Sequence, residues 1–318
     1  MEFDVLVEFL RLSTYRTFRR WLWWFSGFCP SGFPCALDLP AMRRLHLFEF
    51  EDLSWFPKWL RDYGTDFLRA IADQADYYEH LVPIIKQALE RTRQTTCIDI
   101  ASGGGGGWEK MLQRLIPDVP DIRVVLTDFF PNKDAFDYLA RQFPNNISYY
   151  AKPVNALKVP HALKGLRTQF VSFHHFPPHQ AQRLISNAVL QQSPILIVEA
   201  QERSLFTLLK FLILSPLSVW WLTPRIRPFK WRRLLFTYLI PIIPAYLLWD
   251  GLVSVCRTYR ANEMLDFAHR ADVDRLYIWE VGRITDKLLP VTYLLGYPVN
   301  HPSDRTGGQN MSSFTAGR

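Results

Sequence analysis

Residues 97–108 constrain the fold more than any other part of the chain, and their sequence is Cys-Ile-Asp-Ile-Ala-Ser-Gly-Gly-Gly-Gly-Gly-Trp. A short apolar run that contains one acid leads into five consecutive glycines, which predicts a buried strand followed by a tight turn. Glycine adopts positive φ angles at little cost and lets other groups come close to the backbone. In a sheet with helices on both faces, such a turn follows the first strand and lies at the edge where ligands bind.

Residues 47–93 have apolar positions at helical spacing, and apolar runs then alternate with helical stretches up to residue 204 and again from about residue 257, which is typical of a mainly parallel sheet covered on both faces. We therefore expect an α/β fold with a doubly wound, seven-stranded, mainly parallel sheet that ends in an antiparallel hairpin. The predicted strands are residues 96–101, 123–128, 147–152, 169–173, 195–199, 277–282 and 291–296. The predicted helices of this region are residues 108–115, 133–142, 180–190 and about 257–270.

Composition divides the chain into six parts. They are an N-terminal extension (1–46), a helical cap (47–95), a ligand-binding core (96–204), an apolar basic insert (205–249), the C-terminal completion of the core (250–300) and a disordered tail (301–318). The extension has no clear signal peptide, and the four cysteines indicate neither a disulfide scaffold nor a zinc site. We expect a cytoplasmic protein in a reducing compartment, and no metal site.

The insert holds most of the net charge of +7, because its basic residues have no acidic residue among them. Its apolar stretches, 205–222 and 234–249, contain prolines, and a membrane span needs about 20 apolar residues, so neither is a clean transmembrane helix. We expect either a hairpin that binds an anionic membrane surface, as a peripheral or monotopic anchor, or a lid over the ligand site. Basic residues embedded among tryptophans and aliphatic residues do not indicate nucleic-acid binding. The basic residues are Lys210, Arg225, Arg227, Lys230, Arg232 and Arg233.

The glycine spacing separates two classes of nucleoside ligand. A dinucleotide fingerprint, GxGxxG, needs a third glycine three positions after the second. With Gly103 and Gly105 as the first two glycines, Trp108 takes the third place, and in the other register Ser102 takes the first place. Asp99 at the strand end would also repel a pyrophosphate, whereas it would favour a cationic ligand. An NAD(P)-dependent oxidoreductase is therefore the weaker alternative.

The segment Asp99-Ile-Ala-Ser-Gly103-Gly-Gly105 resembles the acidic-x-Gly-x-Gly-x-Gly turn of class I S-adenosylmethionine-dependent methyltransferases, which have a Rossmann-like fold. Asp128 closes the second predicted strand, where the acid of that family accepts hydrogen bonds from the ribose hydroxyls. Asn155-Ala156 falls where the family usually has Asp and a small residue beside the adenine. Ala101 stands in place of the first glycine of the family motif. The resemblance implies cofactor-binding roles for Asp99, Ala101, Ser102, Gly103, Gly105, Asp128, Asn155 and Ala156.

His174 and His175 follow the fourth predicted strand, within a segment that resembles the motif after that strand in the family. Either imidazole can act as a general base near neutral pH, or both can pack around the site without a chemical role. Glu199 and Asp250 can orient the substrate, or serve as caps and ion-pair partners. Phe48-Glu-Phe-Glu-Asp-Leu is among the phrases that resemble a methyltransferase-like subgroup without an assigned substrate.

These features predict an S-adenosylmethionine-dependent methyltransferase that acts on a hydrophobic small molecule or lipid, because both readings of the insert place an apolar wall beside the cofactor. Catalysis would come mainly from proximity and orientation in a direct in-line displacement. The alternative is a membrane-associated binding or scaffolding protein with a vestigial cofactor site, which the changes at Ala101 and Asn155 favour.

Overall fold

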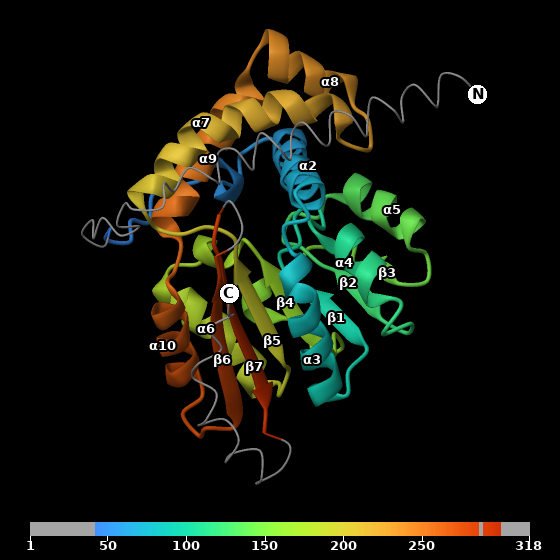
Figure 1. Ribbon diagram of the computed structural model, residues 1–318, viewed down its shortest axis with the longest axis vertical. Helices are drawn as coiled ribbons and strands as arrows, with labels where there is room; N and C mark the ends of the chain where they lie inside the picture. Colours follow the sequence, from blue (N-terminus) through green and yellow to red (C-terminus); the bar gives the residue numbers. More distant parts are fainter. Residues whose placement is uncertain (1–41, 286–288, 300–318) are drawn as a thin grey trace, which may run out of the picture.

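The computed structural model describes residues 42–285 and 289–299, in which seven strands form one mixed sheet of order β3-β2-β1-β4-β5-β7-β6 (Figure 1). The first five strands are parallel, and β7 runs antiparallel to both of its neighbours, β5 and β6. The predicted doubly wound sheet with a C-terminal hairpin is confirmed. The strands are β1 (Thr96–Asp99), β2 (Arg123–Leu126), β3 (Ile147–Tyr149), β4 (Leu166–Phe170), β5 (Ile195–Glu199), β6 (Tyr277–Ile284) and β7 (Val291–Pro298).

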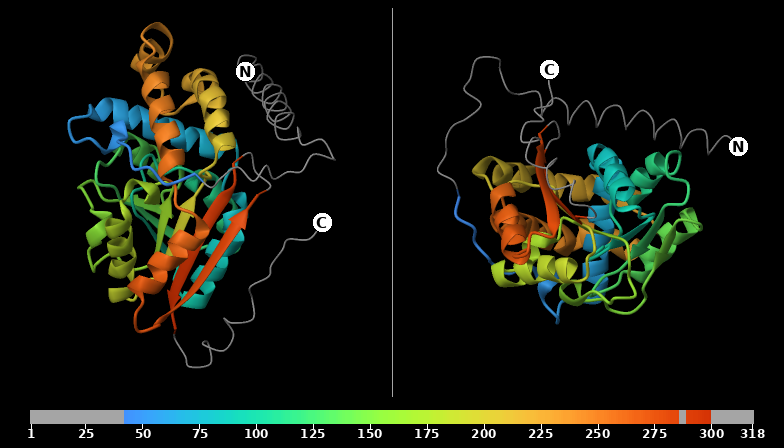
Figure 2. Two further views of the ribbon diagram at one scale, coloured as in Figure 1. Left: turned by 90° about the vertical axis from the view of Figure 1, so that its left-hand side faces the viewer. Right: turned by 90° about the horizontal axis from the view of Figure 1, so that it is seen from below.

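Helices cover both faces of the sheet (Figure 2). Side chains alternate between the faces of a strand, so Cys97 packs with α3 (Val82–Thr92), α4 (Trp108–Leu115) and α5 (Lys133–Gln142), and Ile98 packs on the other side. That second face is covered by α6 (Pro178–Leu190) and α10 (Ala261–Ala271). The helices α4 and α5 have the predicted bounds. The short helical turns are η1 (Phe50–Asp52), η2 (Glu79–Leu81), η3 (Ala156–Lys158) and η4 (Phe173–His175).

The fourth strand begins earlier than the apolar pattern predicts. We expected residues 169–173, whereas β4 is Leu166–Phe170 and residues 173–175 form the turn η4. The residues at the start of this strand are polar but buried inside the sheet, so the apolar pattern does not reveal where the strand begins. They are Arg167, Thr168 and Gln169. Two nitrogens of the Arg167 guanidinium donate to the side-chain oxygens of Asn187 on α6 and of Gln191 directly after it. These bonds compensate in part for the burial of a charge that the apolar pattern excludes from a core strand.

The insert is a group of helices beyond the carboxyl ends of the parallel strands (Figures 1 and 2). It packs against α2 (Lys58–Gln74) of the cap through a separate apolar cluster that includes Phe67, Val219 and Tyr246. The predicted boundary at residue 249 falls inside its last helix. The elements of the insert are α7 (Leu205–Leu222), η5 (Thr223–Arg225), α8 (Trp231–Leu234), the π-helical turn η6 (Leu235–Leu239) and α9 (Ile242–Arg257).

One helix of the described chain, Leu205–Arg225, is long and apolar enough to cross a membrane, and 17% of its apolar window is buried. The helices Trp231–Leu239 and Ile242–Arg257 pass the same test only together, and they are bent by 77°. The predicted tail and the first 41 residues of the predicted extension lie outside the described residues.

Candidate functional site

Asp99 ends β1 as a buried carboxylate directly before the glycine-rich turn. The hydroxyl of Thr168 on the neighbouring strand β4 donates a hydrogen bond to its Oδ1 at 2.9 Å. Burial raises the pKa of Asp99 to about 7, because the charged form loses its hydration. A cation bound beside Asp99 would compensate for that lost hydration, as the sequence predicts for this position.

Besides Gly107 (φ 83°), which precedes α4, the turn after Asp99 contains three residues in the left-handed region, Ala101 (φ 54°), Gly103 (φ 56°) and Gly105 (φ 75°). Ala101 therefore carries a Cβ in a conformation that favours glycine, which costs roughly 1–2 kcal/mol. Ser102 braces the turn, since its hydroxyl donates to the Asp99 carbonyl at 2.8 Å and accepts from the Thr127 amide at 3.1 Å. Ser102 thus ties together the ends of β1 and β2.

Packing explains the other glycines, which we had attributed to a ligand. A Cβ on Gly104 would lie 2.5 Å from the carbonyl oxygen of Thr65 on α2, and one on Gly107 would lie 2.1 Å from the ring of Tyr78. Gly106 lies against the backbone of α2 at Arg69. The cap thus rests directly on the turn, and its contacts account for these three glycines without a ligand. A ligand can occupy only the other side of the turn, which faces Asp99 and Asp128.

Asp128 follows β2, and its carboxylate accepts backbone hydrogen bonds from Gly103 at 2.8 Å and Phe130 at 2.7 Å. Burial raises its pKa, and these two amides oppose the rise. Each carboxylate oxygen keeps a further lone pair for a hydroxyl donor. Asn155 is joined to this corner because the neighbouring Val154 amide donates to the Asp128 carbonyl.

Asn155 is exposed, and its side-chain oxygen accepts from the Leu157 amide at 2.8 Å, which caps η3. Its amide NH₂ group remains available to a ligand, whereas we expected the oxygen to accept from an adenine. Ala156 is buried in the core beneath it. The structure thus gathers the eight predicted cofactor-binding residues at the carboxyl ends of β1, β2 and β3.

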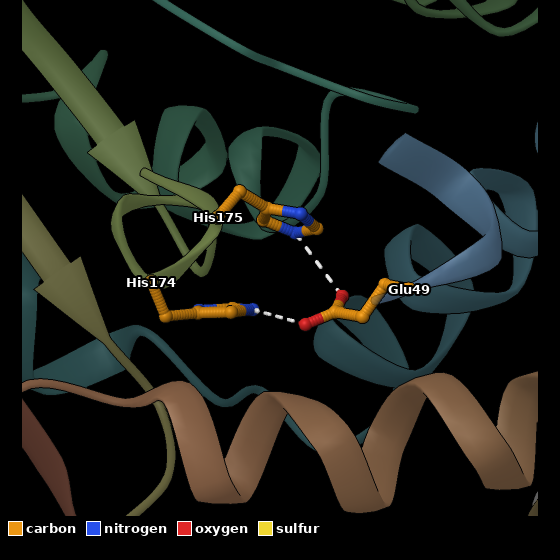
Figure 3. Close-up of side chains that lie close together, drawn as sticks. All are labelled: Glu49, His174 and His175. Carbon is orange, nitrogen blue, oxygen red and sulfur yellow. Dashed lines mark ion pairs between the residues drawn. The ribbon is translucent and has the colours of Figure 1, made fainter. Parts of the chain in front are cut away.

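The two predicted catalytic histidines lie on η4, and both imidazoles point toward the buried carboxylate of Glu49 (Figure 3). The Nε2 atom of His174 is 3.8 Å from Glu49 Oε1, and the Nε2 atom of His175 is 3.6 Å from Glu49 Oε2. Each Nδ1 atom contacts a different carboxylate, Glu199 at 2.8 Å and Asp52 at 2.7 Å. We call these five residues the histidine cluster.

Electrostatics separate the two histidines. Burial would lower the pKa of His175, but the carboxylates of Glu49 and Asp52 raise it to about 10. His175 is therefore an imidazolium at neutral pH in this state, and it has no lone pair with which to act as a base. Burial would raise the pKa of Asp52, but His175 and Arg257 hold it well below its usual range.

Glu49 and its partner Arg257 were not among the predicted site residues. Arg257 Nη1 contacts Glu49 at 2.8 Å and Asp52 at 2.6 Å, and nothing in its local sequence indicates this role. Phe50, the residue after Glu49, is 200 residues from Asp250, whose carboxylate accepts the Phe50 amide at 2.8 Å. The available signal was the acidic phrase at residues 48–53, in which charges interrupt an apolar run.

Two cavities border α2, and neither borders the glycine turn. One of about 430 Å³ is lined by Lys58, Trp59, Asp62, Lys133 and Asp134. The other, of about 290 Å³, is mainly aromatic and lies between α2 and the insert, with Trp59, Tyr63, Trp231, Arg232, Leu235 and Phe236 around it.

No protein-family model and no curated protein sequence matches the chain. Among solved structures, LepI in complex with SAM is 15% identical at a TM-score of 0.40, and the match covers 68% of this chain and 46% of LepI. The pyocyanin biosynthetic protein PhzM is 15% identical at a TM-score of 0.41, and the match covers 72% of this chain and 56% of PhzM. A SAM-dependent methyltransferase from Aquifex aeolicus is 11% identical at a TM-score of 0.39, and the match covers 68% of this chain and 88% of that enzyme. The chain thus spans about half of LepI and PhzM.

At these TM-scores the fold is assigned from the sheet itself. The five parallel strands, the antiparallel β7 between β5 and β6, and the glycine-rich turn after the central β1 form the arrangement that the resemblance predicts. The chain therefore has the seven-stranded, Rossmann-like fold of class I S-adenosylmethionine-dependent methyltransferases.

Proposed function

We propose that the chain binds S-adenosylmethionine and transfers its methyl group to an apolar small molecule or lipid. The observation that carries this proposal is the pair of acids, buried Asp99 and partly buried Asp128, on either side of the left-handed turn at Gly103. Asp99 suits the cationic amino-acid part of the cofactor, and the free lone pairs of Asp128 suit the two ribose hydroxyls. A pyrophosphate ligand would meet two carboxylates, which disfavours a dinucleotide.

Strand order supports a position for the acceptor at the other half of the sheet edge. The cofactor-binding residues follow β1, β2 and β3, whereas the histidine cluster lies at the ends of β4 and β5. When bound, S-adenosylmethionine supplies a sulfonium methyl carbon, whose S–C bond breaks as a lone pair of the acceptor forms the new bond and the acceptor releases its proton. Residues of the chain contribute mainly by holding the acceptor in line.

His174 is the candidate for receiving the acceptor's proton. Glu199 holds its Nδ1 atom and also accepts its backbone N–H at 2.8 Å, which fixes the ring. A carboxylate partner at Nδ1 favours the tautomer whose Nε2 atom carries the lone pair. That Nε2 atom lies 3.1 Å from the hydroxyl of Ser254 on α9, a group of the kind that the ring would deprotonate.

The exposed face of α7 supports a membrane-bound acceptor. Large apolar side chains at helical spacing face outward, and Phe206 among them is 63% exposed. Arg225, Arg227 and Arg232 are exposed near the end of this helix and can meet lipid phosphates. Arg233 and Lys230 instead pair with Asp66. They therefore contribute less positive charge to a membrane-binding surface than the sequence suggests. The outward apolar residues of α7 are Leu205, Phe206, Leu209, Leu212, Ile213, Leu217 and Trp220.

Cofactor binding tests the first half of the proposal. We expect S-adenosylmethionine and S-adenosylhomocysteine to bind in titration calorimetry, and Asp128→Ala to weaken both by at least about tenfold, since a hydrogen bond to a charged group contributes about 1.5–3 kcal/mol. Asp274→Ala, at an exposed acid before β6, is the matched control. Absence of binding to the unmodified protein, or equal affinities for all three proteins, would refute the proposal.

Methyl-labelled cofactor and a fractionated cell extract test the second half. We expect label in the apolar or lipid fraction, dependent on the protein and reduced by Asp128→Ala. Label confined to polar small molecules would refute the acceptor class while leaving cofactor binding intact.

Membrane association has its own measurement. The Phe206→Asp/Ile213→Asp variant should lose sedimentation with vesicles that contain anionic phosphatidylglycerol. Leu190→Asp should keep sedimentation, because Leu190 is 81% exposed at the opposite edge of the sheet. Equal loss in both variants would contradict a docking role for α7.

Two observations favour the alternative of a binding protein with a vestigial site. The cap lies directly on the glycine turn, and Ala101 keeps a strained conformation there. Cofactor binding without turnover on any extract fraction would support this alternative over the enzyme.

A further inference from the structure

Glu49, His174 and His175 present three ligand atoms to one another, a carboxylate oxygen and two imidazole nitrogens, all within 4.8 Å. Among residues 42–285 and 289–299, no other three His, Cys, Asp or Glu side chains meet this criterion. The carboxylate and the His174 ring are almost fully buried, and Figure 3 shows the rings converging on the carboxylate from one turn.

Each imidazole has a carboxylate at its Nδ1 atom, an arrangement that is common for metal-binding histidines. A metal-bound histidine almost always has a carboxylate, carbonyl or water at its second nitrogen, which sets the tautomer and orients the ring. His174 has Glu199 at Nδ1 and His175 has Asp52 at Nδ1, at 2.8 and 2.7 Å. Both Nε2 atoms are thereby directed toward the same carboxylate.

The charges of the cluster match a divalent cation. Three carboxylates contact the two imidazoles, and one guanidinium, Arg257, contacts Glu49 and Asp52. With neutral imidazoles, three negative charges against one positive charge leave an excess of two. In addition, Glu49 Oε1 is buried and accepts no hydrogen bond of good geometry, although Arg257 lies 2.8 Å away.

We propose that Glu49, His174 and His175 bind a divalent transition-metal ion, with zinc as the preferred ion and one coordination position open to a ligand oxygen. Two histidines and one glutamate are a known catalytic zinc set, with bonds of about 2.0–2.2 Å. Tetrahedral bonds of that length separate the ligand atoms by roughly 3.4 Å, close to the present 3.6 and 3.8 Å contacts of Glu49. Metal binding requires the neutral form of both imidazoles, so the affinity falls as pH falls.

The open position gives the ion a use that rests on the proposed function. A hydroxyl of the acceptor bound there would lose its proton more readily, because the ion stabilises the oxygen anion. An ion at this site and a base role for His174 exclude each other, since both need its Nε2 lone pair.

Metal binding is measured without cofactor or acceptor, so it can fail independently of the proposed function. Protein prepared without a polyhistidine tag is stripped with a chelator and gel-filtered with Zn²⁺ or Co²⁺, and the bound metal per chain is counted by mass spectrometry. The variants are Glu49→Gln and His175→Asn. The control is His179→Asn, at an exposed histidine four residues further along the chain.

We expect one zinc per chain for the unmodified protein and the control, and affinity at least about 10–100-fold lower in both variants, the loss typical of even an outer-shell change. Bound Co²⁺ should give visible absorption bands that the variants lack. If Glu49→Gln fails to fold by circular dichroism, His175→Asn and a chelator-reversible rise of the unfolding temperature with Zn²⁺ carry the test. No zinc on the unmodified protein, or equal zinc on all four proteins, overturns the proposal.

Discussion

Replacing Asp99 by Asn should stabilise the cofactor-free protein and at the same time weaken binding at the proposed cofactor site. The pKa of Asp99 is raised to about 7 in the folded protein by burial, whereas an unfolded Asp titrates near about 3.9. A raised carboxyl pKa means that the folded state binds the proton more tightly. This tighter proton binding stabilises the folded protein fully at pH values below the pKa of the unfolded state. The stabilisation is lost as pH rises through the pKa of Asp99 in the folded state.

The size of the effect follows from that difference. A shift of about 3 units at about 1.4 kcal/mol each gives about 4 kcal/mol of destabilisation by the Asp99 charge above pH 7. Asn keeps an oxygen to accept from Thr168, but its buried NH₂ group without a partner costs about 1–3 kcal/mol. We therefore expect Asp99→Asn to be about 1–3 kcal/mol more stable than the unmodified protein at pH 8, with the advantage lost near pH 4.

Urea unfolding at pH 4.5, 6 and 8 measures this difference, and calorimetry measures the cofactor. The affinity of the unmodified protein for S-adenosylmethionine should rise with pH through about 7, as Asp99 becomes charged. Asp99→Asn should bind about tenfold or more weakly, because a hydrogen bond to a charged group contributes about 1.5–3 kcal/mol. A variant that is less stable than the unmodified protein at pH 8, or that binds the cofactor equally well, would refute the reasoning.

Three further substitutions test the packing around the site by urea unfolding. Ala101→Gly should leave stability unchanged or raise it by about 1 kcal/mol, because it relieves the left-handed Ala but adds freedom to the unfolded chain; a clear loss would speak against strain there. Gly107→Ala should cost more than about 2 kcal/mol, since its Cβ would lie 2.1 Å from the Tyr78 ring at a φ of +83°; normal stability would mean that Tyr78 is not held in place. Arg167→Met should cost about 1–3 kcal/mol by leaving Asn187 and Gln191 without their donor, and a gain in stability would show that the guanidinium is poorly compensated.

The strands that the sequence located well are those whose apolar runs have no polar interruption. The run Ile195–Glu199 is buried throughout and was predicted with its bounds, because β5 lies between two strands and beneath helices on both faces. The start of β4 was missed because Arg167 finds its partners on α6, far along the chain. Partners of that kind are a property of the packed fold and leave no periodic pattern in the strand.

The placement of Asp99, Gly103 and Asp128 at one edge of the sheet was largely predictable, since these residues belong to local strand-turn patterns. The histidine cluster was predictable only in part. Its two histidines are adjacent in sequence, but Glu49 and Arg257 come from segments that no local pattern connects with them. Contacts across 208 residues arise only when the insert folds back over the sheet.

The last helix of the insert makes the protein hard to divide. From its start beside the exposed apolar surface, α9 places Asp250 at the Phe50 amide, Ser254 at His174 and Arg257 at Glu49. Excising residues 205–249 would remove the first half of this helix and the face of α9 that packs against α7. The exposed apolar surface of the insert and the histidine cluster are therefore connected by a single helix. A chimaera that replaces the insert with that of another protein must keep the register of α9 to preserve the surface and the cluster.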